Sequence, residues 1–316
     1  MGDCVVKRVQ VLLACYNGGP YLPRQLATLR EQDDPCFSVL MQDDGSSDGT
    51  PSLLREVAGE DERFHLAEEN GHRLGAIGNF WSLLRQSDGE LIALCDQDDE
   101  WNSCRLSRCR EAMVQAEARY GADTPLLVHS DCRLIDGDGA PLAESFFRRQ
   151  GWDPAATALS RLLVQNNVTG CTLMMNAPLR RLALQHGDPA KMYMHDWFLA
   201  LTAAAFGQIV FIPAPLVRYR QHGRNVMGAS ATGQLGRGAR ALSQWEKGKA
   251  RIALTYDHAL AFREAFGDAL PDAACRCIDG YLATRSMGKL RRVLSVRWGG
   301  YTMQSPITRA GQLLFG

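Results

Sequence analysis

The chain has 316 residues with 35 basic and 35 acidic side chains, and this zero net charge argues against a protein that coats nucleic acid. No apolar run approaches the roughly 18 to 20 residues of a membrane-spanning helix, and the start of the chain does not read as a signal peptide. The ten cysteines form no CxxC pair, so we expect no zinc knuckle or disulfide scaffold, and reduced thiols in a cytoplasmic protein.

The first part of the chain alternates apolar runs of strand length with patterns of helical period. We expect strands at residues 8–17, 37–44, 64–71 and 90–95, and helices at 21–31, 50–59 and 77–86. This alternation predicts an α/β fold whose sheet is largely parallel and covered by helices.

Polar residues follow three of the four predicted strands. The first strand ends in ACYNGG, the second in QDDGSSDGT and the fourth in CDQDDEW. Because ligands of such sheets bind beyond the carboxyl ends of the strands, we expect two acidic clusters to meet on one rim.

The segment LCDQDDEW crowds acidic residues behind a buried strand. Such carboxylates raise each other's pKa unless a cation holds them, and Mg²⁺ or Mn²⁺ takes oxygen ligands. Asp96 and Asp98 could both point into one cleft and bind such an ion. The alternative is a solvated acidic turn in which Asp99 caps the following helix.

The segment QDDGSSDGT also resembles the first half of a calcium-binding EF-hand loop. That interpretation fails because the twelfth position, which needs a glutamate, is Arg55. A strand-to-helix turn capped by Asp48 or Thr50 explains most of the segment. It does not explain both Asp43 and Asp44.

Several motifs in this order resemble the family 2 glycosyltransferases of the GT-A fold. They are VLLACYNGGPYLPRQLATLREQ, QDDGSSDGT, ENGHRLGAIGNF, LCDQDDEW, VHSDCRLID, NNVTGCTLMMN and MHDWFLALTAAAFGQIVFIPAPLVRYRQHGRNVMG. The later motifs are similar to the bacterial rhamnosyltransferase-like branch, and the likeness covers residues 8–228. The resemblance implies a GT-A catalytic domain at 1–228, with a mixed, mostly parallel sheet flanked by helices. A helical, basic extension at 229–316 would follow it.

The resemblance also implies a site for a nucleotide-sugar donor and a divalent metal, Mn²⁺ or Mg²⁺. The donor would be bound by Ala14, Tyr16, Asn17, Asp43, Asp44, Asn79, Asp96 and Gln97. The metal would be bound by Asp98 and Asp96, the DXD element of the family, and by His222. A diphosphate-facing or structural role is the alternative for His222.

For catalysis, the resemblance places Asp196 of MHDWF as the base that takes a proton from the acceptor. An ordinary aspartate is a weak base, so apolar neighbours would help by raising its pKa. By itself the motif could simply start a helix. Residues assigned to the acceptor or phosphate side are Asp131, Asn166, Gly170, Trp197, Arg218 and Arg220. The alternative for the two arginines is a solvated edge strand.

The implied function is an inverting, metal-dependent sugar transfer in bacterial surface-polysaccharide synthesis. The subfamily likeness favours dTDP-L-rhamnose as donor and a saccharide or polyprenyl-linked saccharide as acceptor. A UDP-hexose donor is the first alternative. The second is a non-catalytic nucleotide or carbohydrate binder, which would more naturally lack Asp196 or the DXD pair.

The C-terminal segment carries no acidic residue from Tyr281 onward. Basic side chains interleave with apolar ones there: Arg285, Lys289, Arg291, Arg292, Arg297 and Arg309. This segment could lie on an anionic membrane surface, giving a peripheral protein at the inner face of the membrane. The alternative is a helix packed on the catalytic domain with a solvated basic face.

Overall fold

The computed structural model describes residues 7–223 and 237–315. In this part of the chain the strands join into one nine-stranded mixed sheet. Its order is β3-β2-β1-β4-β8-β6-β9-β5, with β7 paired to β6. The strands are β1 (Val9–Cys15), β2 (Phe37–Asp43), β3 (Phe64–Leu66), β4 (Leu91–Asp96), β5 (Glu100–Trp101), β6 (Leu126–Ile135), β7 (Pro141–Ala143), β8 (Leu173–Asn176) and β9 (Gln208–Arg220).

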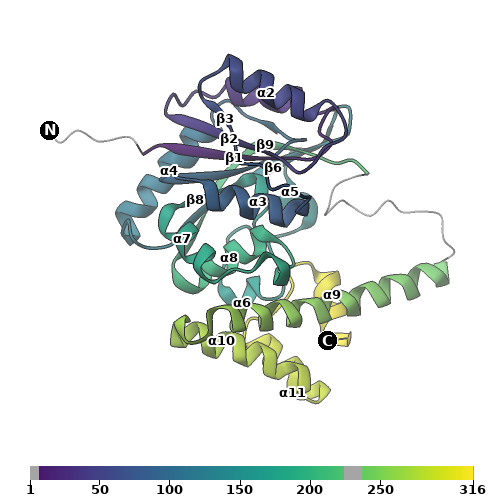
Figure 1. Cartoon of the computed structure of the whole chain (residues 1–316). Coiled ribbons are helices and arrows are strands. Elements are labelled where there is room, and N and C mark those ends of the chain that lie inside the picture. The colour runs from purple at the N-terminus through teal and green to yellow at the C-terminus, as the bar shows by residue number, and fades with distance from the viewer. Residues whose placement is uncertain (1–6, 224–236, 316) are drawn as a thin grey trace.

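Helices cover both faces of the sheet. Figure 1 shows α2 on one side, and α8 with the C-terminal helices on the other. The helices are α1 (Leu22–Arg30), α2 (Thr50–Glu60), α3 (Gly75–Gln86), α4 (Arg105–Tyr120), α5 (Phe146–Gln150), α6 (Leu159–Leu162), α7 (Ala177–His186), α8 (His195–Phe206), α9 (Arg237–Phe266), α10 (Asp272–Ala283), α11 (Lys289–Trp298) and α12 (Pro306–Phe315). This confirms the predicted α/β fold.

The central strands are apolar on both faces because helices cover each one. On β4, Ile92 and Leu94 belong to the core beside α8, whereas Leu91 and Ala93 belong to the core beside α2 and α4. Alternate side chains of a strand point to opposite faces, so a continuous apolar run fills two cores at once. β1, β2 and β4 pair in parallel, so their carboxyl ends lie at the same rim.

The strand expected at 64–71 is shorter in the structure. β3 ends at Leu66, although the N–H of Ala67 still donates to the carbonyl of Met41 over 2.8 Å. This strand lies at the edge of the sheet, where only β2 pairs with it. With one neighbour and charged residues after it, the chain leaves the sheet early.

The C-terminal region is helical, as predicted. Ile252, Phe262 and Tyr281 join the same apolar core as Trp197 and Phe198 of α8. The helices therefore pack on the α/β part through a shared core. The predicted boundary at 228/229 lies outside the described residues. Within the described ranges, no helix is both long enough and apolar enough to cross a bilayer.

Candidate active site

A cavity of about 1320 Å³ opens at the carboxyl ends of β1 and β4. Its walls come from the loop after β1, the start of α3, the segment after β4, the start of α8 and the end of β9. Ala250, Arg251 and Leu254 of α9 also line it. The carboxyl rim of an α/β sheet is a typical place for a small-molecule site.

The loops after β1 and β4 are tied together at the floor of the cavity. The N–H of Tyr16 donates to Oε1 of Gln97 over 2.8 Å, and Nε2 of Gln97 donates back to the carbonyl of Tyr16 over 2.8 Å. A Cβ added at Gly18 would lie 2.3 Å from Oε1 of Gln97, so only glycine allows this approach. Asn17 has a left-handed backbone with φ 48, and its Oδ1 accepts from the N–H of Ser47 over 2.9 Å.

The buried Asp44 holds the start of α3 against β2. Its two oxygens accept the backbone N–H groups of Leu74 over 2.6 Å and Gly75 over 2.8 Å. This contact fixes the helix that carries Asn79, which lines the cavity. Asp43 binds a different segment. Its carboxylate accepts the N–H and the hydroxyl of Ser46, and these two bonds close the turn after β2.

Asp96 and Asp98 follow β4 and face the cavity together with His222. Nε2 of His222 lies 2.7 Å from Oδ2 of Asp98. Burial, with the nearby negative charges of Asp98 and Asp196, raises the pKa of Asp96 to about 8. Crowded carboxylates of this kind hold a hard divalent cation, and an imidazole nitrogen beside them is a suitable further ligand. The donor set therefore fits Mg²⁺ or Mn²⁺.

A second group of possible ligands lies deeper, behind this rim. Ligand atoms of Asp96, Asp99 and Cys171 lie within 4.8 Å of one another. Asp99 and Cys171 are almost fully buried and do not line the cavity. Burial and the charges of Asp98 and Asp96 raise the pKa of Asp99, and burial raises the pKa of the Cys171 thiol. A protonated thiol suits a hard cation poorly, so we favour Asp98 and His222 as partners of Asp96.

Asp99 does not cap α4, which was the alternative offered by the sequence. Its Oδ1 accepts the backbone N–H of Arg220 over 3.0 Å. The buried carboxylate thus joins the end of β4 to the end of β9. Because β9 leads directly to His222, this bond helps bring the histidine next to Asp98.

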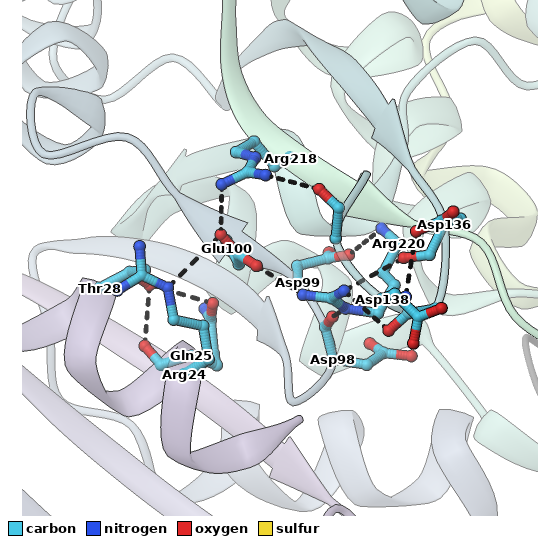
Figure 2. A network of polar contacts seen from close by, with 12 residues as sticks. Arg24, Gln25, Thr28, Asp98, Asp99, Glu100, Asp136, Asp138, Arg218 and Arg220 are labelled. Atoms are coloured by element: carbon cyan, nitrogen blue, oxygen red, sulfur yellow. Dashed lines mark hydrogen bonds and ion pairs between the residues drawn. The ribbon is translucent and has the colours of Figure 1, made fainter. Parts of the chain in front are cut away.

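An arginine–carboxylate network supports the same two strands. Figure 2 shows Glu100 between Arg24, Arg218 and Arg220. Nε of Arg220 also donates to the carbonyl of Asp98 over 2.8 Å. Neither Arg218 nor Arg220 lines the cavity. Since β9 lies between β6 and β5, these arginines point into polar contacts of the protein and form no solvated edge.

We expect Arg220, the buried arginine of this network, to stabilise the fold. Arg220→Met leaves Glu100 and the three backbone carbonyls of Asp98, Asp136 and Gly137 without their guanidinium donor, and should lower the free energy of unfolding by about 3 kcal/mol. Arg24 binds the same carboxylate, but its side chain is 52% exposed against 5% for Arg220. Arg24→Met should therefore cost less than about 1 kcal/mol. Urea unfolding of both variants tests this, and equal costs would contradict it.

Asp196 lies in the first turn of α8 and lines the cavity. Its Oδ2 accepts the N–H of Gly170 over 3.1 Å, whereas its Oδ1 has no hydrogen-bond partner within the described part of the chain. Burial raises the pKa of this carboxyl to about 6, and backbone hydrogen bonds from Trp197 and Gly170 offset only part of the effect. The residue is therefore a stronger base than an ordinary aspartate and has an oxygen left to accept a proton.

The family model for glycosyl transferase family 2 matches residues 10–181, more than half of the chain. The chain belongs to glycosyl transferase family 2. This confirms the family predicted from the ordered motifs. The matched residues include β1, β2 and β4 and the acidic segment after β4.

This family 2 chain is similar to two bacterial proteins and to one solved structure at low sequence identity. An uncharacterized protein of Mycobacterium bovis is 28% identical over 71% of this chain and 62% of its own length. The dTDP-rhamnosyl transferase RfbG of Shigella flexneri is 24% identical over 69% of this chain and 74% of its own length. In structure, S. aureus TarS 1-349 in complex with UDP has a TM-score of 0.55 at 16% identity, covering 90% of this chain and 73% of TarS 1-349. This likeness shows the fold alone.

The structure gathers most of the residues predicted for the family 2 site around one cavity. Those that line it are Ala14, Tyr16, Asn17, Asp44, Asn79, Asp96, Gln97, Asp98, Asn166, Gly170, Asp196, Trp197 and His222. Asp43, Asp131, Arg218 and Arg220 lie outside its lining. The roles of the lining residues stay predictions that rest on the family.

The contacts of Asp131 fit poorly with the acceptor-side role expected for this residue. Its carboxylate accepts the N–H groups of Cys132 over 2.8 Å and Phe146 over 3.1 Å, and the hydroxyl of Ser145. Both oxygens therefore hold β6 and the start of α5 together. Register shifts between β6 and β9 at residues 130–132 bend the strand at this point.

Several side chains that line the cavity were not among the site residues predicted from the sequence. Arg73 lies over the ring of Tyr16 at 3.7 Å from its centroid, and both line the cavity. Arg73 belongs to the motif ENGHRLGAIGNF, so the sequence does contain a signal for a cation beside the expected nucleotide. Four aromatic side chains that line the cavity have no comparable signal in the sequence, because they come from a helix, two loops and a strand: Phe146, Trp152, Tyr193 and Tyr219.

Proposed function

We propose that the chain is an inverting, metal-dependent glycosyltransferase that moves a hexose from a nucleotide sugar to a saccharide or lipid-linked saccharide. We favour dTDP-L-rhamnose as the donor and bacterial surface-polysaccharide synthesis as the process. The ordered motifs and the similarity to the dTDP-rhamnosyl transferase RfbG support this choice.

One observation carries the proposal. Asp196, with an oxygen that lacks a partner in the described part of the chain, lines the same cavity as Asp96, Asp98 and His222. The negative charge of Asp196 contributes to the raised pKa of Asp96, which places the two groups within electrostatic reach. A cation site and a base in one cavity are the two parts that an inverting transfer needs.

In this mechanism the residues at the β1 and α3 side bind the donor nucleoside. Tyr16, Asn17 and Gln97 form a rigid floor, and Asn79 extends from the helix that Asp44 fixes. Asp96, Asp98 and His222 would hold a divalent cation, which supplies charge stabilisation to the departing nucleoside diphosphate.

Asp196 would act on the acceptor. Its carboxylate takes the proton of an acceptor hydroxyl as that oxygen forms a bond to the anomeric carbon. The bond from this carbon to the diphosphate breaks at the same time, and its electron pair leaves with the nucleoside diphosphate. Attack on the face opposite the leaving group inverts the configuration of the sugar.

This role sets the pH dependence of the reaction. Burial raises the pKa of Asp196 from 3.8 to about 6, and the base acts only when it is deprotonated. We therefore expect kcat/KM at saturating Mn²⁺ to be constant above about pH 7 and to fall about tenfold per pH unit well below pH 6. A pH–rate profile checks this. An acid limb centred near pH 4 would assign the base to an ordinary carboxylate.

A donor panel tests the proposed function. The protein is incubated with dTDP-L-rhamnose, UDP-glucose, UDP-GlcNAc and GDP-mannose, with Mn²⁺ or with EDTA, and release of the nucleoside diphosphate is measured. We expect Mn²⁺-dependent release that is fastest with dTDP-L-rhamnose. Preference for a UDP-sugar would correct the donor but keep the mechanism. Binding without turnover of any donor, in the presence of oligosaccharide acceptors, would favour a non-catalytic binder.

A further inference from the structure

The outward face of α11 exposes three large apolar side chains in a row. Leu290 is 76% exposed, Leu294 36% and Trp298 79%. Residues four apart lie on the same face of a helix, so these side chains form one stripe of about two turns. Single exposed apolar residues are common, but a stripe that ends in an exposed tryptophan indicates a contact surface.

Basic side chains border this apolar stripe. With about 3.6 residues per turn, Arg291 and Arg297 fall on either side of it, and both are exposed. Lys289 and Arg292 fall toward the opposite face of the helix, where Arg292 lines a small pocket with Val296. The charged groups of these four side chains form no hydrogen bond or ion pair within the described part of the chain. By contrast, Arg285 just before the helix is paired with Asp257 at 2.9 Å.

The opposite face of α11 fixes the helix in the folded protein. Val296 is 4% exposed and belongs to the core that contains Tyr281 and Tyr301. The apolar stripe therefore points outward in the folded chain and is not an unfolded tail. Figure 1 shows α11 on the side of α9 that faces away from the sheet.

The chemistry of this face matches one kind of surface. Tryptophan sits at the boundary between headgroups and acyl chains, and leucine inserts below it. Unpaired arginines and lysines are attracted to anionic headgroups, and residues 281–316 contain no acidic side chain that would oppose this attraction. We propose that the Leu290–Leu294–Trp298 face of α11 docks the protein on an anionic lipid bilayer. This inference holds whether or not the cavity transfers sugar.

Point substitutions test the docking face better than truncation, because removing residues from Tyr281 onward would also remove core residues. The full chain is sedimented with vesicles of phosphatidylcholine alone or with one third phosphatidylglycerol. We expect binding to the anionic vesicles only, and weaker binding at high salt. The variant Leu290→Glu/Trp298→Glu should bind at least about tenfold more weakly.

Val114→Glu is the control for a new surface carboxylate, because Val114 is 49% exposed on α4, which lies away from α11 in Figure 1. It should bind like the wild type, and circular dichroism checks that all variants fold. Equal binding to neutral vesicles, or wild-type binding by the double variant, would overturn the proposal. So would light scattering that shows a wild-type dimer lost in the double variant, because a second copy would then occupy the face.

Discussion

Replacing Asp196 by asparagine is expected to lower the rate of sugar transfer about 10²- to 10⁴-fold, because an amide cannot accept the proton of the acceptor hydroxyl. Asparagine has nearly the same size and can still accept the N–H of Gly170, so the cavity should keep its shape. Donor affinity should barely change. A loss confined to turnover marks an interaction needed only as the new bond forms.

Calorimetry with the nucleotide sugar and a transfer assay on the same preparation separate the two effects. Asp188→Asn is a suitable control, since Asp188 caps a short turn shortly before α8 and does not line the cavity. This control should transfer sugar at the wild-type rate. Transfer by Asp196→Asn near the wild-type rate would show that another group is the base. Asp131 is a poor substitute, because the structure uses both its oxygens within the fold.

Removal of the Asp98 carboxylate should have the largest effect on donor binding. We expect Asp98→Ala to weaken Mn²⁺-dependent binding of the nucleotide sugar at least about 100-fold, because a direct ligand matters more than the outer partners whose loss costs 10- to 100-fold. In the presence of EDTA, wild type and variant should bind the donor equally weakly.

Asp88→Ala controls for the change in net charge. Asp88 precedes β4 at its other end, is 72% exposed and pairs with Arg8. Its loss should leave Mn²⁺-dependent donor binding unchanged. Donor affinity that is the same with and without EDTA, in both the wild type and Asp98→Ala, would argue against a metal at this carboxylate.

The parallel part of the fold could be predicted because its signals are local. β1, β2 and β4 are continuous apolar runs, and each is preceded or followed by a helix of clear period. The side chains at and beyond their ends then meet at one rim, which explains why Tyr16, Asp44 and Asp96 line the same cavity, as expected from the sequence.

The other side of the cavity depends on contacts between distant segments. The sequence places Arg218 and Arg220 on the acceptor or phosphate side, with a solvated edge strand as the alternative. In the structure β9 pairs with both β6 and β5, and Glu100 forms ion pairs with both arginines. No residue near these arginines in the sequence identifies Glu100 as their ion-pair partner. Asp131 is similar, because its partner Ser145 follows a hairpin and belongs to the start of α5.

The sequence does not reveal which face of the C-terminal helix α11 is buried and which is exposed. A basic, partly amphipathic pattern is compatible with packing or with membrane contact, and in the structure α11 has one buried face and one exposed face. Val296 is buried in the core whereas Trp298 is exposed. Neither periodicity nor composition could separate the two faces without knowing where the core lies.

The most direct test of the account is a crystal structure of the protein soaked with Mn²⁺ and dTDP. The account predicts one Mn²⁺ bound by Asp98, with Asp96 and His222 beside it, and the diphosphate on the same ion. Asp196 should face the open end of that diphosphate across the cavity. A nucleotide bound elsewhere, or a diphosphate held in this cavity with no cation at Asp98, would contradict it.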